Sequence, residues 1–193
     1  DWDKWRTNIN TFPPYTDGKT AEGTIKDIKW MPNGKQVITA HESCDVIMWD
    51  VGKAEILQKF KAFPGLSLIN IAISPDGKFL TTNDKDMLRI RDTNNFENIV
   101  GEIKGDWSVA NHIDWSTNGR FIAVGAFHGS IYILDTQSWK WIQKFDEPKG
   151  QIHEIKFSPM SDFLAVIARD NTFRLWNCKD WQQKIQFPDL SDG

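Results

Sequence analysis

The sequence has 193 residues, of which 40% are hydrophobic and 25% charged, a composition typical of one globular domain. Its net charge of −3 gives no electrostatic reason to expect nucleic acid or an anionic membrane as a partner. No apolar run approaches the roughly 20 residues of a membrane-spanning helix, and the polar first residues lack a signal-peptide pattern. The two cysteines are too few for a disulfide framework, which favours a reducing compartment. The chain begins with Asp1 rather than Met, as expected for a fragment or a processed form.

Residues 1–23 match no later part of the chain, and beyond them a repeat of about 42 residues organises the sequence. Short apolar runs end at Trp30, Ile73, Trp115 and Phe157. A second landmark keeps the same phase, at Trp49-Asp50, Arg91-Asp92, Leu134-Asp135 and Trp176-Asn177. We therefore predict four units within residues 24–187, at about 24–65, 66–107, 108–149 and 150–187. The first 23 residues are then a non-repeat segment or the end of a preceding unit, and residues 188–193 are a tail.

Each apolar run is followed by a turn signal, which reads Pro-Asp-Gly-Lys at residues 75–78. A Gly-Lys pair can belong to a phosphate-binding loop, but such a loop needs several glycines and the start of a helix. Here a strand pattern follows, and related turns recur at Gly34 and Gly119, whereas the fourth unit has lost its glycine. Asn-Gly and Asp-Gly suit tight turns because both residues tolerate positive φ. We predict a hairpin turn once per repeat.

Inside each unit the apolar residues alternate with period two, as in residues 121–135 and 162–177. Short runs rich in Ile, Val, Phe and Trp, interrupted every 8–12 residues by turn residues, are typical of an all-β repeat. Each unit supplies about four strands, and no convincing amphipathic helix is present.

The combination of "SPDGKFL" with a later "IMWD" or "RLWN" resembles the WD40 repeat. This resemblance implies an all-β fold, a β-propeller with one four-stranded blade per repeat. The family's Gly-His dipeptide is absent from all four copies, and its turn aspartate survives only as Asp170. We therefore expect that no blade carries the family's buried Asp-His-Ser/Thr-Trp hydrogen-bond network. Because four blades are few and an open array exposes blade faces, we expect the chain to be part of a larger ring.

Other chemistry is weakly supported. His41 and Cys44 could begin a zinc site, but no second pair of ligands exists, so we expect no metal and no cofactor. No nucleophile elbow or triad pattern is visible, and the polar residues of the expected inner strands are mixed in kind, so we expect no enzyme. A propeller enzyme with a central-channel site remains an alternative, as does a nucleic-acid-associated WD40 subunit, although no basic face is evident.

The resemblance implies a non-catalytic scaffold that binds other proteins in a multiprotein assembly, and we expect it to be cytoplasmic. In that family the turn ahead of the Trp-Asp strand faces the binding surface. Candidate partner-binding residues are Phe127, Arg169, Trp107, Glu42 and Asp84, because aromatic and Arg side chains anchor many interfaces. Residues 115–135 also resemble blades of microtubule-associated, centrosomal and ciliary WD-repeat proteins, which implies a cytoskeletal role as a narrower hypothesis.

Overall fold

The computed structural model describes residues 24–62, 70–84, 86–105, 107, 110–146 and 150–187, and every regular element in these ranges is a β-strand. Consecutive strands form four antiparallel four-stranded sheets, which we call blades 1 to 4. Blade 1 contains β1 (Ile25–Trp30), β2 (Gln36–His41), β3 (Asp45–Asp50) and β4 (Glu55–Lys61). Blade 2 contains β5 (Ile71–Ile73), β6 (Phe79–Asp84), β7 (Met87–Asp92) and β8 (Asn95–Lys104). Blade 3 contains β9 (Ala110–Trp115), β10 (Phe121–Ala126), β11 (Ile131–Asp135) and β12 (Lys140–Phe145). Blade 4 contains β13 (Ile152–Phe157), β14 (Phe163–Ala168), β15 (Phe173–Asn177) and β16 (Gln183–Phe187). Among these described residues, no helix could cross a membrane.

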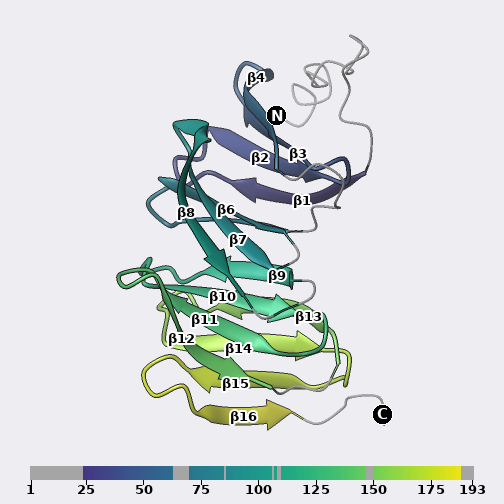
Figure 1. The fold of residues 1–193 in the computed structure, drawn as a ribbon, viewed down its shortest axis with the longest axis vertical. Helices are drawn as coiled ribbons and strands as arrows, with labels where there is room; N and C mark the ends of the chain where they lie inside the picture. Colours follow the sequence, from purple (N-terminus) through teal and green to yellow (C-terminus); the bar gives the residue numbers. More distant parts are fainter. Residues whose placement is uncertain are drawn as a thin grey trace, which may run out of the picture.

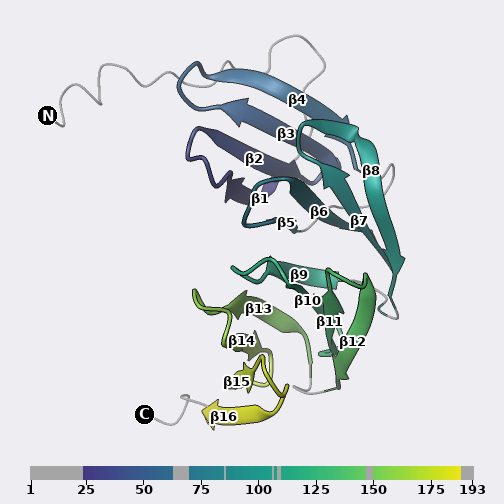
Figure 2. The same cartoon turned by 90° about the vertical axis from the view of Figure 1, so that its left-hand side faces the viewer.

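The blades follow one another along the molecule, with blade 1 and blade 4 at its two ends (Figure 1), and together they form an open arc (Figure 2). The first strands of the blades line the concave side of the arc, and β4, β8 and β12 lie on its outer side (Figure 2). Packing between blades joins blade 1 to blade 2, blade 2 to blade 3, and blade 3 to blade 4. The predicted all-β propeller architecture with four WD40-type blades is confirmed, whereas membership of a larger ring stays a prediction.

The predicted hairpin turns lie between the first and second strands of the blades. Gly34, Gly77 and Gly119 have φ of +67°, +73° and +73°, in the region that glycine enters at little cost. In blade 2, Asp76 Oδ1 accepts hydrogen bonds from the Lys78 N–H and from Ser74 Oγ, which fixes the turn. The Gly-Lys pair is therefore a turn, and the phosphate-loop reading is excluded at this position.

Blade 3 shows why the alternating pattern folds into a layered core. The side chains of Ile122 and Val124 pack with blade 2, whereas those of Phe121 and Ala123 pack with blade 4. Successive residues of a strand point to opposite faces, so these contacts bury both faces of β10. This explains why all six residues of β10 are apolar or glycine. Blade 3 thus contributes one sheet face to the apolar core shared with blade 2 and the other face to the core shared with blade 4.

Polar side chains on the inner strands, or directly before them, tie each blade to the next. Asp27 Oδ2 accepts hydrogen bonds from Asn70 Nδ2 and from the Ile71 N–H, both at 2.9 Å. Asn70 Oδ1 accepts one from the Ile113 N–H at 2.8 Å, and an oxygen of Asp114 accepts one from the Phe157 N–H at 2.8 Å. Burial makes such bonds important, because an unpaired backbone N–H there would be costly.

The first turns also interlock from blade to blade. A Cβ added to Gly77 would lie 3.3 Å from Cδ of Pro32 in the preceding blade, and a Cβ added to Gly119 of blade 3 would lie 3.4 Å from Cγ of Pro75 in blade 2. At the third junction Thr117 stands in place of the proline and Ser161 in place of the glycine. Their hydroxyl oxygens are 2.6 Å apart and share a hydrogen bond. Blade 4 has a serine in place of the glycine, and blade 3 has a threonine in place of the proline that would face it.

Candidate functional site

The candidate site is the rim formed by the turns between the second and third strands of the blades. In an antiparallel four-stranded blade these turns lie at the opposite end from the first-to-second-strand turns. The rim carries Glu42 in blade 1, Phe127 in blade 3 and Arg169 in blade 4. The structure therefore brings these predicted residues to one side of the arc.

Phe127 is an exposed aromatic residue on a rigid support. Its side chain is 48% exposed, although β10 and β11 on either side are fully buried. The Ala126 N–H donates to the Ser130 carbonyl at 2.8 Å, and Gly129, with φ of +100°, donates to the Ala126 carbonyl. An exposed ring on a fixed turn can enter a partner surface with little loss of conformational entropy.

Arg169 is exposed at the equivalent turn of blade 4, which its neighbour Asp170 holds in place. Asp170 accepts hydrogen bonds from Thr172 Oγ1 at 2.6 Å and from Arg174 Nη2 at 2.8 Å. Burial alone would raise the pKa of Asp170, but the hydrogen bonds from Arg174 and Thr172 outweigh it and lower that pKa below its ordinary value. Asp170 therefore stays ionised and keeps the turn ordered under Arg169.

Two other predicted residues contribute less. Glu42 is exposed and forms an ion pair with Lys26 at 3.4 Å, and its hydrogen bond from Lys26 lowers its pKa. An exposed pair of this kind is worth little and would be screened by salt. The backbone of Asp84 pairs with Met87 at the end of β6, but the side chain of Asp84 lies outside the described part of the structure.

The prediction that Trp107 is a binding residue is wrong. Its side chain is 2% exposed and packs edge-on against Tyr132 and Trp141, with ring centroids 5.1 Å apart in both pairs. A Cβ on Gly105 would collide with the Trp107 ring, so the glycine makes room for it. Trp107 has no tryptophan counterpart at the same position of the other repeats. Its burial could therefore not be predicted by comparing the repeats.

Blade 1 contains a buried Thr-His-Trp part of the family's network, although His41 Nδ1, which the network's aspartate would bind, has no hydrogen-bond partner among the described residues. Trp49 Nε1 donates to Thr39 Oγ1 at 2.9 Å, and Thr39 Oγ1 lies 2.9 Å from His41 Nε2. Burial lowers the pKa of His41, although the charge of buried Asp45 opposes that shift. The network was missed because this histidine comes from the end of β2 rather than from a Gly-His dipeptide ahead of the first strand.

The inner strands place charged groups on the concave side of blades 3 and 4. His112 Nδ1 lies 3.9 Å from Glu154, and Lys156 Nζ lies 3.4 Å from Asp114. Burial lowers the pKa of His112 despite the nearby Glu154, and burial raises the pKa of Asp114 despite Lys156. The Asp114 carboxylate is used to hold the Phe157 N–H, and no group of three potential metal ligands occurs among the described residues. These contacts join blades, and they form no arrangement recognisable as an acid–base site.

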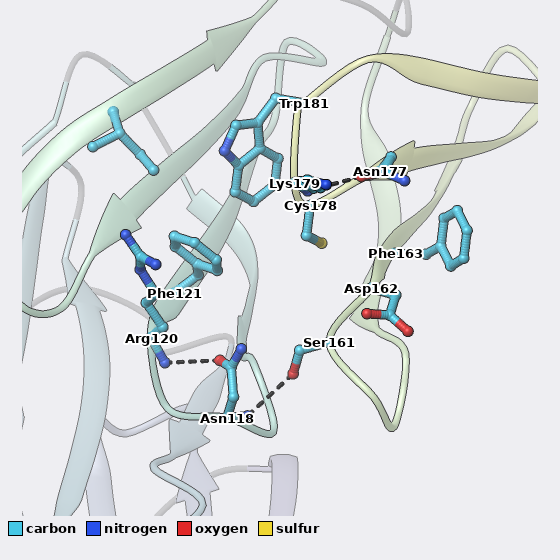
Figure 3. Close-up of a pocket in the computed structure, with 11 residues that line it drawn as sticks. Asn118, Arg120, Phe121, Ser161, Asp162, Phe163, Asn177, Cys178, Lys179 and Trp181 are labelled. Carbon is cyan, nitrogen blue, oxygen red and sulfur yellow. Dashed lines mark hydrogen bonds between the residues drawn. The ribbon is translucent and has the colours of Figure 1, made fainter.

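A cavity of about 660 Å³ lies between blades 3 and 4 on the side opposite the candidate rim. Trp181 stands beside Phe121 on one wall, and the Asn118 N–H donates to Ser161 Oγ across the base (Figure 3). Burial, with a smaller effect from Asp162, raises the pKa of the Cys178 thiol in this cavity to about 12, so the thiol is protonated and unreactive at neutral pH. Similar cavities occur at both other blade junctions, which marks them as products of the repeat rather than as one specialised pocket.

The family model for the WD domain, G-beta repeat, matches residues 10–50, 98–135 and 139–177. The chain belongs to the WD40 family. Each match ends at a Trp-Asp landmark, so the WD40 sequence repeat is offset from the structural blade by about one strand. The repeat that ends at Arg91-Asp92 is not matched separately, and it is the copy in which Arg91 occupies the tryptophan position.

Several WD-repeat proteins are similar to this chain over most of its length. It is 23% identical over 182 residues to Actin-interacting protein 1 of Drosophila melanogaster, which covers 86% of this chain and 28% of that protein. It is 28% identical over 150 residues to Protein groucho of Drosophila melanogaster, covering 74% of this chain and 20% of that protein. The chain thus spans about a quarter of the length of these two relatives.

The solved structure of U3-55K has the same fold, with a TM-score of 0.77 at 15% sequence identity. The match covers 86% of this chain and 52% of that one. At this identity the likeness shows the propeller architecture, and the names of these relatives describe those proteins only.

Proposed function

We propose that this WD40 chain is a non-catalytic scaffold that binds other proteins in a multiprotein assembly through the rim of second-to-third-strand turns. The observation that carries the proposal is the pair Phe127 and Arg169, both exposed, on neighbouring blades and on turns fixed by hydrogen bonds. Binding residues concentrate in loops that a rigid framework holds, and aromatic and Arg side chains supply much of the affinity of interfaces.

The chemistry of the pair indicates what a partner segment should carry. A ring such as Phe127 is best covered by apolar side chains, and a guanidinium such as Arg169 binds a carboxylate with two parallel hydrogen bonds. The preferred partner surface therefore combines an apolar side chain with an Asp or Glu. Nucleic acid is a poorer candidate, because the chain carries more acidic than basic residues.

The test is quantitative affinity capture with the wild-type chain and with the double variant Phe127→Ala/Arg169→Ala. We expect the double variant to lose the captured partners by roughly tenfold or more, since each anchor is worth about 1–2 kcal/mol. A matched control is Met160→Ala/Lys179→Ala, which removes an exposed apolar side chain and a cation from the opposite side of blade 4. Equal capture by wild type and by the Phe127/Arg169 variant, with unchanged thermal melting, would contradict the proposed rim.

A narrower candidate is a cytoplasmic scaffold of the cytoskeleton. It is supported by the resemblance of residues 115–135 to blades of microtubule-associated WD-repeat proteins, and by similarity to a protein named for its interaction with actin. Co-sedimentation with microtubules and, separately, with actin filaments tests it. A chain that stays in the supernatant with both polymers would remove the cytoskeletal hypothesis and leave the scaffold proposal standing.

A further inference from the structure

The repeat produces a cavity at each of the three blade junctions, but the side chains that line these cavities differ. The cavity between blades 1 and 2 has no aromatic residue in its described lining. The cavity between blades 3 and 4 has aromatic rings together with two cations, Arg120 and Lys179, and one carboxylate, Asp162. The cavity between blades 2 and 3 has aromatic rings and one charged side chain, Asp76. Of the three cavities, this one therefore combines aromatic walls with a net negative charge.

We call the cavity between blades 2 and 3 the middle cavity. It measures about 510 Å³ and is lined mainly by the first turns of blades 2 and 3 and by residues between β11 and β12. These turns lie on the side opposite the candidate rim. Blade 2 packs between blades 1 and 3, and blade 3 packs between blades 2 and 4, so the middle cavity lies away from both ends of the arc. Every residue of its lining belongs to the described ranges.

The aromatic rings of the middle cavity are not closed on one another. Phe79 and Trp115 are nearly parallel, with an interplanar angle of 12° and ring centroids 6.5 Å apart. Trp139 is 39% exposed and makes no ring contact with another described residue. At the next junction the rings 42 residues further along the chain do meet, since Trp181 contacts Phe121 edge-on with centroids 5.1 Å apart. The face of Trp139 is therefore open to a ligand.

The carboxylate of Asp76 is held in the middle cavity in its charged form. Its Oδ1 accepts hydrogen bonds from Ser74 Oγ at 2.7 Å and from the Lys78 N–H at 3.1 Å. Burial alone would raise the pKa of Asp76, but these hydrogen bonds outweigh it and lower that pKa below its ordinary value. Asp76 Oδ2 lies 3.4 Å from Lys78 Nζ, in an exposed pair that solvent screens and that a ligand cation can replace.

The turn before Trp139 is fixed by the side chain of Asp135. Its Oδ1 accepts hydrogen bonds from the Gln137 N–H at 3.0 Å and from the Ser138 N–H at 2.8 Å. Trp139 itself has φ of +53°, a left-handed conformation that is unfavourable for a tryptophan. Because the turn is held in place, the exposed ring can contact a ligand with little further loss of conformational entropy.

We propose that the middle cavity binds an arginine side chain of a partner polypeptide. A guanidinium is a flat cation that stacks on an aromatic face, here that of Trp139, and donates hydrogen bonds to a carboxylate, here that of Asp76. A lysine ammonium supplies the charge but neither the flat surface nor the fork of donors, and an acidic side chain would be repelled. The site lies on the opposite side from the Phe127 and Arg169 rim, and its use does not depend on that rim.

Binding of a short peptide, followed by nuclear magnetic resonance, tests the proposal. The probe is acetyl-Gly-Gly-Arg-Gly-Gly-amide, and the signal is the indole N–H of Trp139, identified by its loss in Trp139→Phe. We expect this signal to shift saturably, with a dissociation constant in the millimolar range. The peptide with lysine in place of arginine should bind roughly fivefold more weakly, and the peptide with neutral citrulline should not bind. An unmoved Trp139 signal, or equal binding of the lysine or citrulline peptide, overturns the proposal.

Two variants test the assigned contacts through the peptide's own signals, measured by saturation transfer. Asp76→Asn removes the charge and keeps the turn, because Asn118 accepts the equivalent hydrogen bonds in the first turn of blade 3. Asp76→Asn and Trp139→Ala should each weaken binding of the arginine peptide by roughly tenfold. Binding as in wild type by either variant, with unchanged thermal melting, overturns the proposal.

The matched control is Asp162→Asn, which makes the same substitution in the cavity between blades 3 and 4. It should bind the arginine peptide like wild type, and a loss equal to that of Asp76→Asn would contradict the assignment to the middle cavity. The Phe127→Ala/Arg169→Ala variant should also bind the peptide like wild type. Failure of the rim and failure of the middle cavity are therefore distinguishable.

Discussion

Blades 3 and 4 have the same strand pattern but differ in how much of it is buried. Every residue of β10 and β11 in blade 3 is buried, whereas β14 and β15 in blade 4 alternate between buried and more exposed residues. The difference comes from neighbours, because blade 3 lies between two blades and the described structure covers only one face of blade 4. In a repeat architecture the stability of a unit thus depends on the interfaces it makes as well as on its own sequence.

The largest expected effect concerns the enclosed side of blade 3. Trp107→Ala removes a ring that is fully buried between Tyr132 and Trp141, and it should lower the free energy of unfolding by about 3–5 kcal/mol. Chemical denaturation measures this loss. Trp139→Ala, which truncates a partly exposed ring in the same blade, is the control and should cost much less. If the two variants were equally stable, Trp107 would not be a core residue.

A matched pair tests the comparison between the blades directly. Ile133 of blade 3 and Leu175 of blade 4 occupy the same repeat position, but only Ile133 is completely buried. Ile133→Ala should cost about 2–5 kcal/mol and Leu175→Ala about 1 kcal/mol, because the second side chain loses less buried area. Chemical denaturation measures both losses. Equal costs would show that the face of blade 4 is covered in solution.

The smallest effect concerns the pH dependence of blade 4. The pKa of Asp170 is below its ordinary value in the folded protein, so its contribution is present above the unfolded pKa of about 4 and is lost as pH falls through the folded value. Asp170→Asn should therefore be destabilising near neutral pH and approach wild type in acid. Unfolding free energies measured from about pH 6 to about pH 2 give the comparison.

The control for this prediction is Asp180→Asn in the same blade. Asp180 pairs with Lys184, but both side chains are exposed and solvent screens the pair, so the change should be smaller. A stability difference between wild type and Asp170→Asn that stays constant across the whole pH range would contradict the assigned role of Asp170.

The fold could be predicted because its signals are local and repeated. The turns at Gly34, Gly77 and Gly119 depend on backbone conformations that few residues adopt, and their spacing counts the blades. The candidate rim followed from the same count, which placed Phe127 and Arg169 on equivalent turns. Whether those two residues bind a partner stays a prediction.

The remaining features depend on contacts between segments that the sequence does not pair. Trp107 has no repeat partner, so its burial under Tyr132 and Trp141 could not be distinguished from exposure. Ile28 and Ile113 look alike in sequence and differ in burial because a preceding blade covers one of them in the structure. The Thr39–His41–Trp49 network was hidden because its histidine stands at another point of the repeat.

The interlocking first turns have a consequence for how this protein can change over evolution. A proline in one blade is matched to a glycine in the next, and at the third junction a threonine is matched to a serine. Blades are therefore not interchangeable modules: a copy of blade 4 inserted directly after itself would set Ser161 against Pro159, and neither established pairing would form. A repeat newly placed before blade 4 must therefore carry a partner for Ser161, whereas a second copy of blade 2 would keep the proline–glycine contact, so the order of the blades is constrained most at the third junction.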